Sequence, residues 1–132
     1  LEVHMPLKAL SANRMHYANA KRDTVEYKRY KLAVFNALKE HRFTVEKDDK
    51  YKLSLIVGYS SKLSDLDNCF KPLLDSMQRV LSFDDRQVFE IEALKEHTAK
   101  GDEFIMVRME TITDNQWRRR LHKLFSFFKG AK

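Results

Sequence analysis

Residues 51–59 carry apolar side chains at every second position, and this alternation limits the possible folds more than any other feature of the chain. A period of two is typical of a β-strand, because successive side chains point to opposite faces of the sheet. The expected inner face carries Tyr51, Leu53, Leu55, Val57 and Tyr59. Ile56 lies on the other face, which indicates that both faces are partly covered.

The surrounding segments predict an α+β fold with one mixed sheet. We expect a strand over residues 1–7, a polar loop over 8–22, a helix from about Thr24 to Lys39, the strand over 51–59, a helix from about Asp65, strands over 87–95 and 103–112, and a helix over about 114–128. Asp23 and Glu26 have the spacing of a capping box for the first helix. The turn at residues 100–102 predicts that the last two strands form a hairpin. At 132 residues, this order favours a single domain with helices packed on the sheet.

The helix expected from Asp65 has a core stripe at helical spacing, formed by Leu66, Phe70, Leu73, Leu74, Met77 and Leu81. Pro72 lies within this pattern and should weaken or kink the helix, unless the helix begins later. Cys69, the single cysteine, cannot form an internal disulfide, so it fits a reducing compartment. We expect it to contribute to packing rather than to act as a nucleophile.

The charge of the chain favours a polyanionic partner. The formal net charge is +6 at pH 7, which favours nucleic acid first and an acidic membrane surface second. No apolar run reaches the roughly 18 residues needed to cross a bilayer, so we expect no membrane span. The sequence has neither a P-loop nor a dinucleotide-binding fingerprint, and we expect no organic cofactor.

An acidic run goes against this positive charge. Asp65 and Asp67 are separated by one residue at a helix entrance, Lys71 follows on the helix, and Asp85 precedes the next strand. Hard divalent cations prefer oxygen ligands. Three carboxylates from two elements can hold one or two Mg²⁺ ions and leave positions open for water and a phosphate oxygen. Helix capping and i,i+4 pairing of Lys71 fit the same spacing, and spacing alone leaves both interpretations open.

The string D-L-D-N-x-x-K-x-x-x-D at residues 65–75, followed by F-D-D-x-Q-V at 83–88 and by Lys95, resembles the signature of the RusA family of Holliday-junction resolvases. The N-terminal strand with its proline and the S-A-N-R run at 11–14 are also similar, so the resemblance covers residues 1–112. It implies a small Mg²⁺-dependent endodeoxyribonuclease, in which Mn²⁺ can substitute. It further implies a homodimer that binds four-way junctions and cuts two opposed strands, in the cytoplasm of a bacterium or a phage-infected host.

The resemblance also implies roles for individual residues. Asp65, Asp67 and Asp85 would be catalytic carboxylates that bind the metal, and Lys71 the lysine needed for cleavage. Asn68 and Asp84 would support the ligand carboxylates through hydrogen bonds. The positions expected to contact DNA within residues 1–112 are Asn13, Arg14, Lys71, Arg86 and Lys95.

The C-terminal segment, residues 113–132, lies beyond the resemblance. From residue 115 on it has six basic residues and no acid, and its helical pattern carries an apolar stripe of Trp117, Leu121, Leu124, Phe125 and Phe128. A docked terminal helix, a dimer contact, a membrane-surface helix and a DNA-binding arm all fit this pattern. We expect the basic side, including Arg118 and Arg119, to add phosphate contacts and to steepen the salt dependence of DNA binding.

Three other functions remain open at this point. A branched-DNA nuclease that also cuts forks and flaps would share the same site. A non-catalytic branched-DNA-binding module would keep the basic surface and use the acidic residues structurally. A basic protein that acts at a membrane or on a protein partner would depend only on the C-terminal helix.

Overall fold

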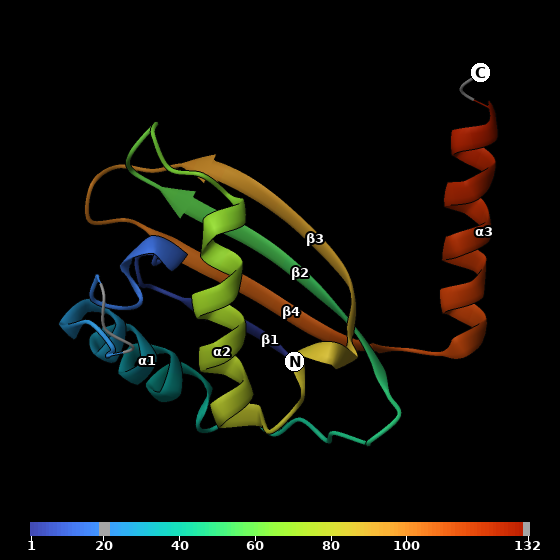
Figure 1. Cartoon of the computed structure of the whole chain (residues 1–132), viewed down its shortest axis with the longest axis horizontal. Helices are drawn as coiled ribbons and strands as arrows, with labels where there is room; N and C mark the ends of the chain where they lie inside the picture. The colour runs from blue at the N-terminus through green and yellow to red at the C-terminus, as the bar shows by residue number, and fades with distance from the viewer. Residues whose placement is uncertain (19–21, 131–132) are drawn as a thin grey trace.

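The computed structural model describes residues 1–18 and 22–130, so part of the expected loop 8–22 and the last two residues lie outside the described chain. The main elements are β1 (Glu2–Met5), α1 (Val25–Leu38), β2 (Lys50–Tyr59), α2 (Phe70–Leu81), β3 (Val88–His97), β4 (Phe104–Ile112) and α3 (Asp114–Gly130). Three short 3-10 turns are η1 (Ala12–Arg14), η2 (Asp67–Cys69) and η3 (Asp85–Gln87). Figure 1 shows α1 and α2 on one side of the sheet and α3 beyond β3.

The four strands form one mixed sheet in the order β1-β4-β2-β3. β3 runs parallel to β2, whereas β4 runs antiparallel to β2 and to β1. The predicted α+β class with a mixed sheet is confirmed. The predicted hairpin of the last two strands is wrong, because β2 lies between them. The α2 crossover makes β3 parallel to β2, and the following turn carries the chain to the other side of β2.

Gly58 permits this crossing of the chain. A Cβ atom at position 58 would lie only 2.4 Å from the ring of Phe104, the first residue of β4. The backbone N–H of Thr98 also donates to the carbonyl of Tyr59 at 2.9 Å, which holds the end of β3 against the end of β2. The close approach of these segments therefore requires a residue without a side chain at position 58.

The core lies between the sheet and the α1–α2 layer. The alternating residues expected on the inner face of β2 are all buried, and they pack with Val34 and Leu38 of α1 and Leu73 and Met77 of α2. The expected cap of α1 was wrong: the Thr24 hydroxyl accepts from the backbone N–H of Tyr27 at 3.0 Å. Asp23 instead pairs with Lys31, and the Lys31 ammonium lowers the pKa of that carboxyl.

The second helix begins at Phe70, after the η2 turn, rather than at Asp65. Pro72 therefore falls in its first turn, where the missing backbone N–H would have no partner within the helix. The helix ends at Leu81, and its C-cap Ser82 has a left-handed φ of 61°. α2 thus runs for 12 residues with Pro72 in its first turn.

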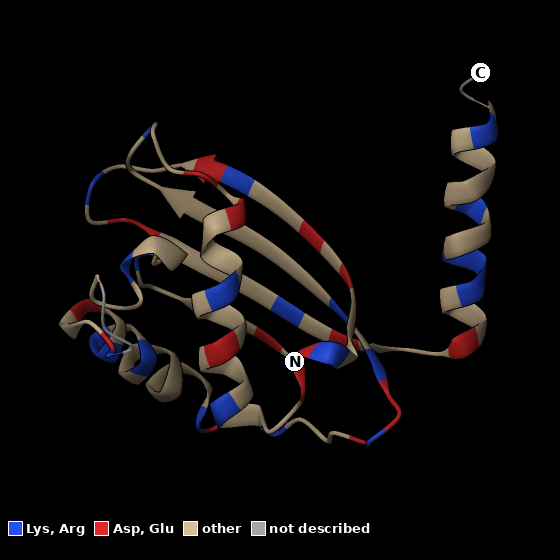
Figure 2. Ribbon diagram, viewed as in Figure 1, with Lys and Arg blue, Asp and Glu red and all other residues tan. Residues whose placement is uncertain are grey.

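The other face of the sheet is largely open, and α3 contacts the domain through its first turns and then extends beyond it. None of the 17 residues of α3 is buried. Figure 2 shows blue Lys and Arg bands along α3 after a single red position at its start. No helix among residues 1–18 and 22–130 is long and apolar enough to cross a membrane.

Candidate active site at the carboxyl end of β2

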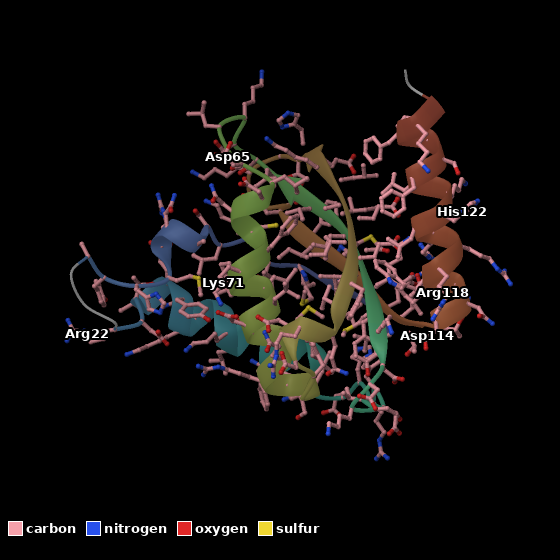
Figure 3. The ribbon with its side chains drawn as sticks, turned by 45° about the vertical axis from the view of Figure 1, so that its right-hand side comes forward. Arg22, Asp65, Lys71, Asp114, Arg118 and His122 are labelled. Atoms are coloured by element: carbon pink, nitrogen blue, oxygen red, sulfur yellow. The ribbon has the colours of Figure 1, made fainter. Side chains whose placement is uncertain are left out.

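The loop that follows β2 places Asp65 and Asp67 at the entrance to α2. Both side chains are exposed, and Asp67 opens the η2 turn. The phenol of Tyr59, which is buried at the end of β2, donates to the backbone carbonyl of Asp65 at 3.5 Å. Asn68 Nδ2 donates to Asp65 Oδ2 at 3.4 Å. Figure 3 shows Asp65 in this loop, beyond the first turn of α2. The carboxylates are therefore open to solvent while the loop that carries them is held by the domain.

Lys95 reaches the same loop from β3. The parallel register places it beside Val57, near the end of β2. Its ammonium donates to the backbone carbonyl of Ser64, the residue before Asp65, and lies 5.6 Å from the centre of the Tyr59 ring. The fold thus brings a cation predicted from the sequence next to the carboxylate loop.

Lys71 lies in the first turn of α2 and is exposed. Its Nζ lies 3.1 Å from Oδ1 of Asp75, one helical turn further on. Lys71 is exposed and Asp75 is half-buried, and i,i+4 ion pairs on helix surfaces contribute only about 0.2–0.5 kcal/mol. Lys71 can therefore exchange Asp75 for a phosphate group at little cost in free energy.

Asn13 and Arg14 belong to η1, which lies against η2. They line a cavity of about 810 Å³ that extends to Asp65 and Asn68. Arg14 faces Glu26 across 3.5 Å, with both side chains exposed. The cavity joins the predicted N-R pair to the predicted carboxylates.

The sequence analysis missed two cations of this cavity, Lys8 and Arg29. Arg29 is an exposed residue of α1, and nothing in its spacing distinguishes it from other solvent-facing helix residues. Only the packing of α1 beside η1 brings it to the wall of the cavity. These two cations add positive charge near the carboxylate loop.

Asp84, Asp85 and Arg86 lie at the opposite end of α2, in and before η3. Asp84 caps η3: its carboxylate accepts from the backbone N–H of Arg86 at 2.9 Å, and the Gln87 side chain accepts from the backbone N–H of Asp84 at 3.0 Å. The Arg86 guanidinium lies 2.7 Å from Asp84 Oδ2 and lowers the pKa of the Asp84 carboxyl well below its usual range. Arg86, expected to contact DNA, is thus paired with Asp84.

The expected group of three carboxylates does not form within one chain. β2 and β3 are parallel, so the end of β2 and the start of β3 lie at opposite ends of the sheet. The 12 residues of α2, about 18 Å at 1.5 Å per residue, separate the Asp65–Asp67 loop from Asp85. Among residues 1–18 and 22–130, no three carboxylate, histidine or cysteine groups lie together as metal ligands would.

Cys69 behaves as expected from the sequence. It is 1% exposed, and burial raises the pKa of its thiol. Burial also raises the pKa of the adjacent Tyr59 phenol. Both groups are therefore neutral near pH 7, and they support the loop rather than provide a nucleophile.

The Asp65–Asp67 loop has a donor set that fits Mg²⁺. Mg²⁺ takes oxygen ligands, keeps several waters and binds proteins through one or two carboxylates together with substrate phosphates. The two exposed aspartates and the amide oxygen of Asn68 offer that chemistry, and Lys95 contacts the same loop. Arg118 and Arg119 do not belong to this cluster, since they lie on α3, and Figure 3 shows Arg118 pointing away from the sheet.

A comparison with known protein families identifies one match. The family model described as "Endodeoxyribonuclease RusA" matches residues 6–108. A search of curated proteins gave no match. The matched range contains the Asp65–Asp67 loop, Lys71, Asp85 and Lys95, and it ends before α3.

Proposed function

Since the chain belongs to the RusA family of endodeoxyribonucleases, we propose that it resolves four-way DNA junctions by Mg²⁺-dependent cleavage of two opposed strands. The family itself implies a nuclease that acts on Holliday junctions. The observation that carries the finer proposal is the pair of exposed aspartates, Asp65 and Asp67, on a loop that is held to the domain by Tyr59 and contacted by Lys95.

In this proposal Asp65 and Asp67 hold Mg²⁺, and Mn²⁺ can replace it. The bound ion lowers the pKa of water and neutralises negative charge on the phosphate. Asn68 orients the Asp65 carboxylate through the hydrogen bond at 3.4 Å. Lys71 leaves Asp75 and binds an oxygen of the scissile phosphate, where it stabilises the charge that grows during cleavage.

We further propose that Asp85 acts in the site of a second copy. A two-fold axis that places two copies antiparallel to each other brings the η3 end of one chain beside the Asp65 end of the other. Symmetric cutting of a junction also needs two sites related by a two-fold axis. The separation of Asp85 from Asp65 within one chain supports this composite arrangement, because one chain alone offers only two of the three carboxylates.

DNA contacts would come from two basic regions. Asn13, Arg14 and Arg29 line the cavity next to the carboxylates and suit the phosphates of the cleaved strand. Arg118 and Arg119 on α3 are exposed and suit the arms of the junction. Both sets would contact DNA phosphates rather than bases, so DNA binding would depend on the shape of the DNA and not on its base sequence.

A labelled synthetic four-way junction, incubated with the protein in Mg²⁺ or in EDTA, tests the proposal. Asp67→Asn should reduce cleavage on the order of 1,000-fold and leave junction binding largely intact, because few phosphate contacts are lost. Glu40→Gln, the same chemical change at an exposed residue beyond α1, is the matched control and should cut normally. Cutting by Asp67→Asn at the wild-type rate would exclude the assignment.

A non-catalytic junction-binding module is the second candidate, favoured by the distance of Asp85 from Asp65 within one chain. It predicts tight junction binding and no cleavage in either Mg²⁺ or Mn²⁺ by the wild-type protein. Comparison of junction, flap and plain duplex substrates separates a strict resolvase from a nuclease of broader branched-DNA specificity.

A further inference from the structure

α3 carries an apolar face of which only Trp117, in the first turns, packs on the described part of its own chain. Leu124, Phe125 and Phe128 are 53%, 61% and 63% exposed. At 100° per residue, Trp117, Leu121, Leu124 and Phe128 fall on one side of the helix, with Phe125 at its margin. Single exposed apolar residues are ordinary, but a contiguous stripe indicates an interaction surface.

The start of α3 is fixed to the end of β4. Only Thr113 separates the two elements. Its hydroxyl accepts from the backbone N–H of Gln116 at 3.2 Å, and the Gln116 side chain accepts from the backbone N–H of Thr113 at 2.9 Å. Asp114 also pairs with Lys50 of β2 at 2.6 Å. This reciprocal cap sets the direction in which the helix leaves the sheet.

Two further contacts hold the first turns of α3 on β3. The Trp117 and Phe89 rings meet edge to face at 5.4 Å, and Arg120 lies 2.7 Å from Glu90. Figures 1 and 3 show the rest of α3 extending past β3, on the side of the sheet away from α1 and α2. Folding α3 back onto its own sheet would break these contacts and the cap. Its own sheet is therefore not the surface that covers the stripe.

The open face of the sheet complements α3 in both hydropathy and charge. Ile56, Leu94 and Met106 are neighbours in the strand register and form an exposed apolar centre, over a shallow hollow of about 350 Å³. The charged residues on this face are Glu2, Glu90, Glu92, Glu96, Glu110, Lys50, Lys52 and Arg108. Acidic groups therefore outnumber basic ones there, whereas the described part of α3 has one acidic residue, Asp114, and five basic ones.

The free edge of β3 offers a surface along which two copies can meet. It is an edge strand of ten residues that pairs only with β2 among the described residues. Phe89, Ile91 and Leu94 on it are exposed. A long exposed edge with apolar side chains is normally covered or paired. α3 leaves its domain across this edge, so a second copy beside β3 would lie under the unpartnered part of the helix.

We propose that the occupant is a second copy of this chain: each α3 crosses β3 and lays its stripe on the open sheet face of the other copy. Trp117 packs on its own β3, and Leu121, Leu124 and Phe128 continue the stripe onto the partner. Residues 121–130, which extend past β3, cover about 15 Å by 10 Å. Two reciprocal contacts, counted on both copies, therefore bury about 600 Å², and the contact between the two β3 edges supplies the rest of the roughly 1,000 Å² that a stable interface needs.

This inference names the contact surface of the homodimer proposed above. The two copies run antiparallel to each other across β3, which is the orientation that the composite site requires. Its test needs neither DNA nor Mg²⁺, so a failure of the nuclease proposal and a failure of the α3 proposal are distinguishable.

Sedimentation equilibrium of the full chain tests the proposal. Wild type should dimerise, and Leu124→Asp should raise the dimer dissociation constant at least about tenfold, because a charge would be buried in the contact. Ser126→Asp adds the same charge on the opposite side of α3 and should leave the constant unchanged. Leu94→Asp on the receiving face should weaken the dimer as Leu124→Asp does. Both leucines are more than half exposed in one chain, so circular dichroism should show that the variants fold.

Mixing the two weakened variants gives the decisive result. A mixed dimer of Leu124→Asp and Leu94→Asp chains contains one contact in which helix and sheet are both intact, so the mixture should dimerise more tightly than either variant alone. The proposal is overturned if wild type is monomeric, if Leu124→Asp leaves the mass unchanged, or if mixing restores nothing, as α3–α3 packing would predict. A Leu124→Asp variant that dimerises normally but loses binding to anionic phospholipid vesicles would assign the stripe to a membrane surface instead.

Discussion

Aspartates lie at both ends of α2, but they differ in whether their carboxylates already have partners. Asp84, at the η3 end, is engaged by the Arg86 guanidinium and by the backbone of its own turn. Asp65 and Asp67, at the η2 end, are exposed, and the Asp65 carboxylate accepts a long hydrogen bond from Asn68 at 3.4 Å. A carboxylate that is already neutralised stabilises a turn, whereas one with free oxygens can take a cation. The local partners of an aspartate, rather than its residue type, therefore distinguish a carboxylate that caps a turn from a candidate metal ligand.

Asp65→Asn and Asp84→Ala give the sharpest comparison of the two ends. We expect Asp65→Asn to lower junction cleavage on the order of 1,000-fold with little change in melting temperature. Asp84→Ala removes a cap and an ion partner, so it should lower the melting temperature by about 2–5 °C and leave at least a third of the cleavage rate. Calorimetry and a junction cleavage assay measure both effects. The contrast between the two ends fails if Asp84→Ala is the more damaging change to cleavage.

Mixed dimers test whether the two ends act together across two copies. Asp67→Asn and Asp85→Asn chains should each be inactive alone. In an equal mixture half of the dimers are mixed, and each of these has one complete site, so about a quarter of the wild-type sites should return. The product should be a nick on one strand. A mixture as inactive as its components would show that each site uses carboxylates of a single chain.

A substitution at Lys95 measures how much cleavage depends on the contact that holds the loop before η2. Lys95→Met removes the contact to the Ser64 carbonyl and a cation beside the carboxylates. We expect a loss of about 10–100-fold in cleavage rate, the usual effect of losing a group that orients metal ligands. Lys100→Met, in the exposed turn before β4, is the matched control. Equal activities of the two variants would remove Lys95 from the site.

We expect the smallest effect in the acid titration of the Asp84 carboxyl, at the η3 end of α2. The pKa of Asp84 is lowered from 3.8, chiefly by the hydrogen bond from Arg86. The ionised form therefore stabilises the fold fully above about pH 4, and this contribution is lost as the pH falls through the lowered folded-state pKa. Arg86→Gln should raise the Asp84 pKa in a ¹³C NMR titration, whereas Arg42→Gln should not. An Asp84 that titrates at its ordinary value in wild type would contradict the pairing.

Alternation and helical spacing predicted the elements of the fold well, because these patterns report which face of a segment is buried. Tyr51 to Tyr59 pointed to the buried face of β2, and the stripe from Phe70 to Leu81 pointed to α2. The neighbours of each strand could not be predicted in this way. The pattern of residues 103–112 is the same whether the strand pairs with β3 or crosses to β2, and the close contact that permits the crossing depends on Gly58.

The residues of the candidate site remain a prediction, and their arrangement in the fold could not be predicted from the sequence. Asp65, Asn68 and Lys95 lie close together because β2 and β3 end at the same edge of the sheet. Asp85 is only 18 residues from Asp67, yet a parallel strand–helix–strand unit sends the chain back to the opposite edge before β3 begins. Arg29 carried no signal in the sequence, since its role follows from how α1 packs.

The length of α2 would affect how the protein behaves in a cell, because this helix separates Asp65 and Asp67 from Asp85. If the site is shared between two copies as proposed, a single newly synthesised chain would not cleave DNA by itself. At low abundance the competent species would then grow with the square of expression level, so that halving synthesis would cut cleavage capacity about fourfold. The separation imposed by α2 would thus make cleavage depend strongly on protein concentration, which would protect the chromosome from unwanted nicks at low expression.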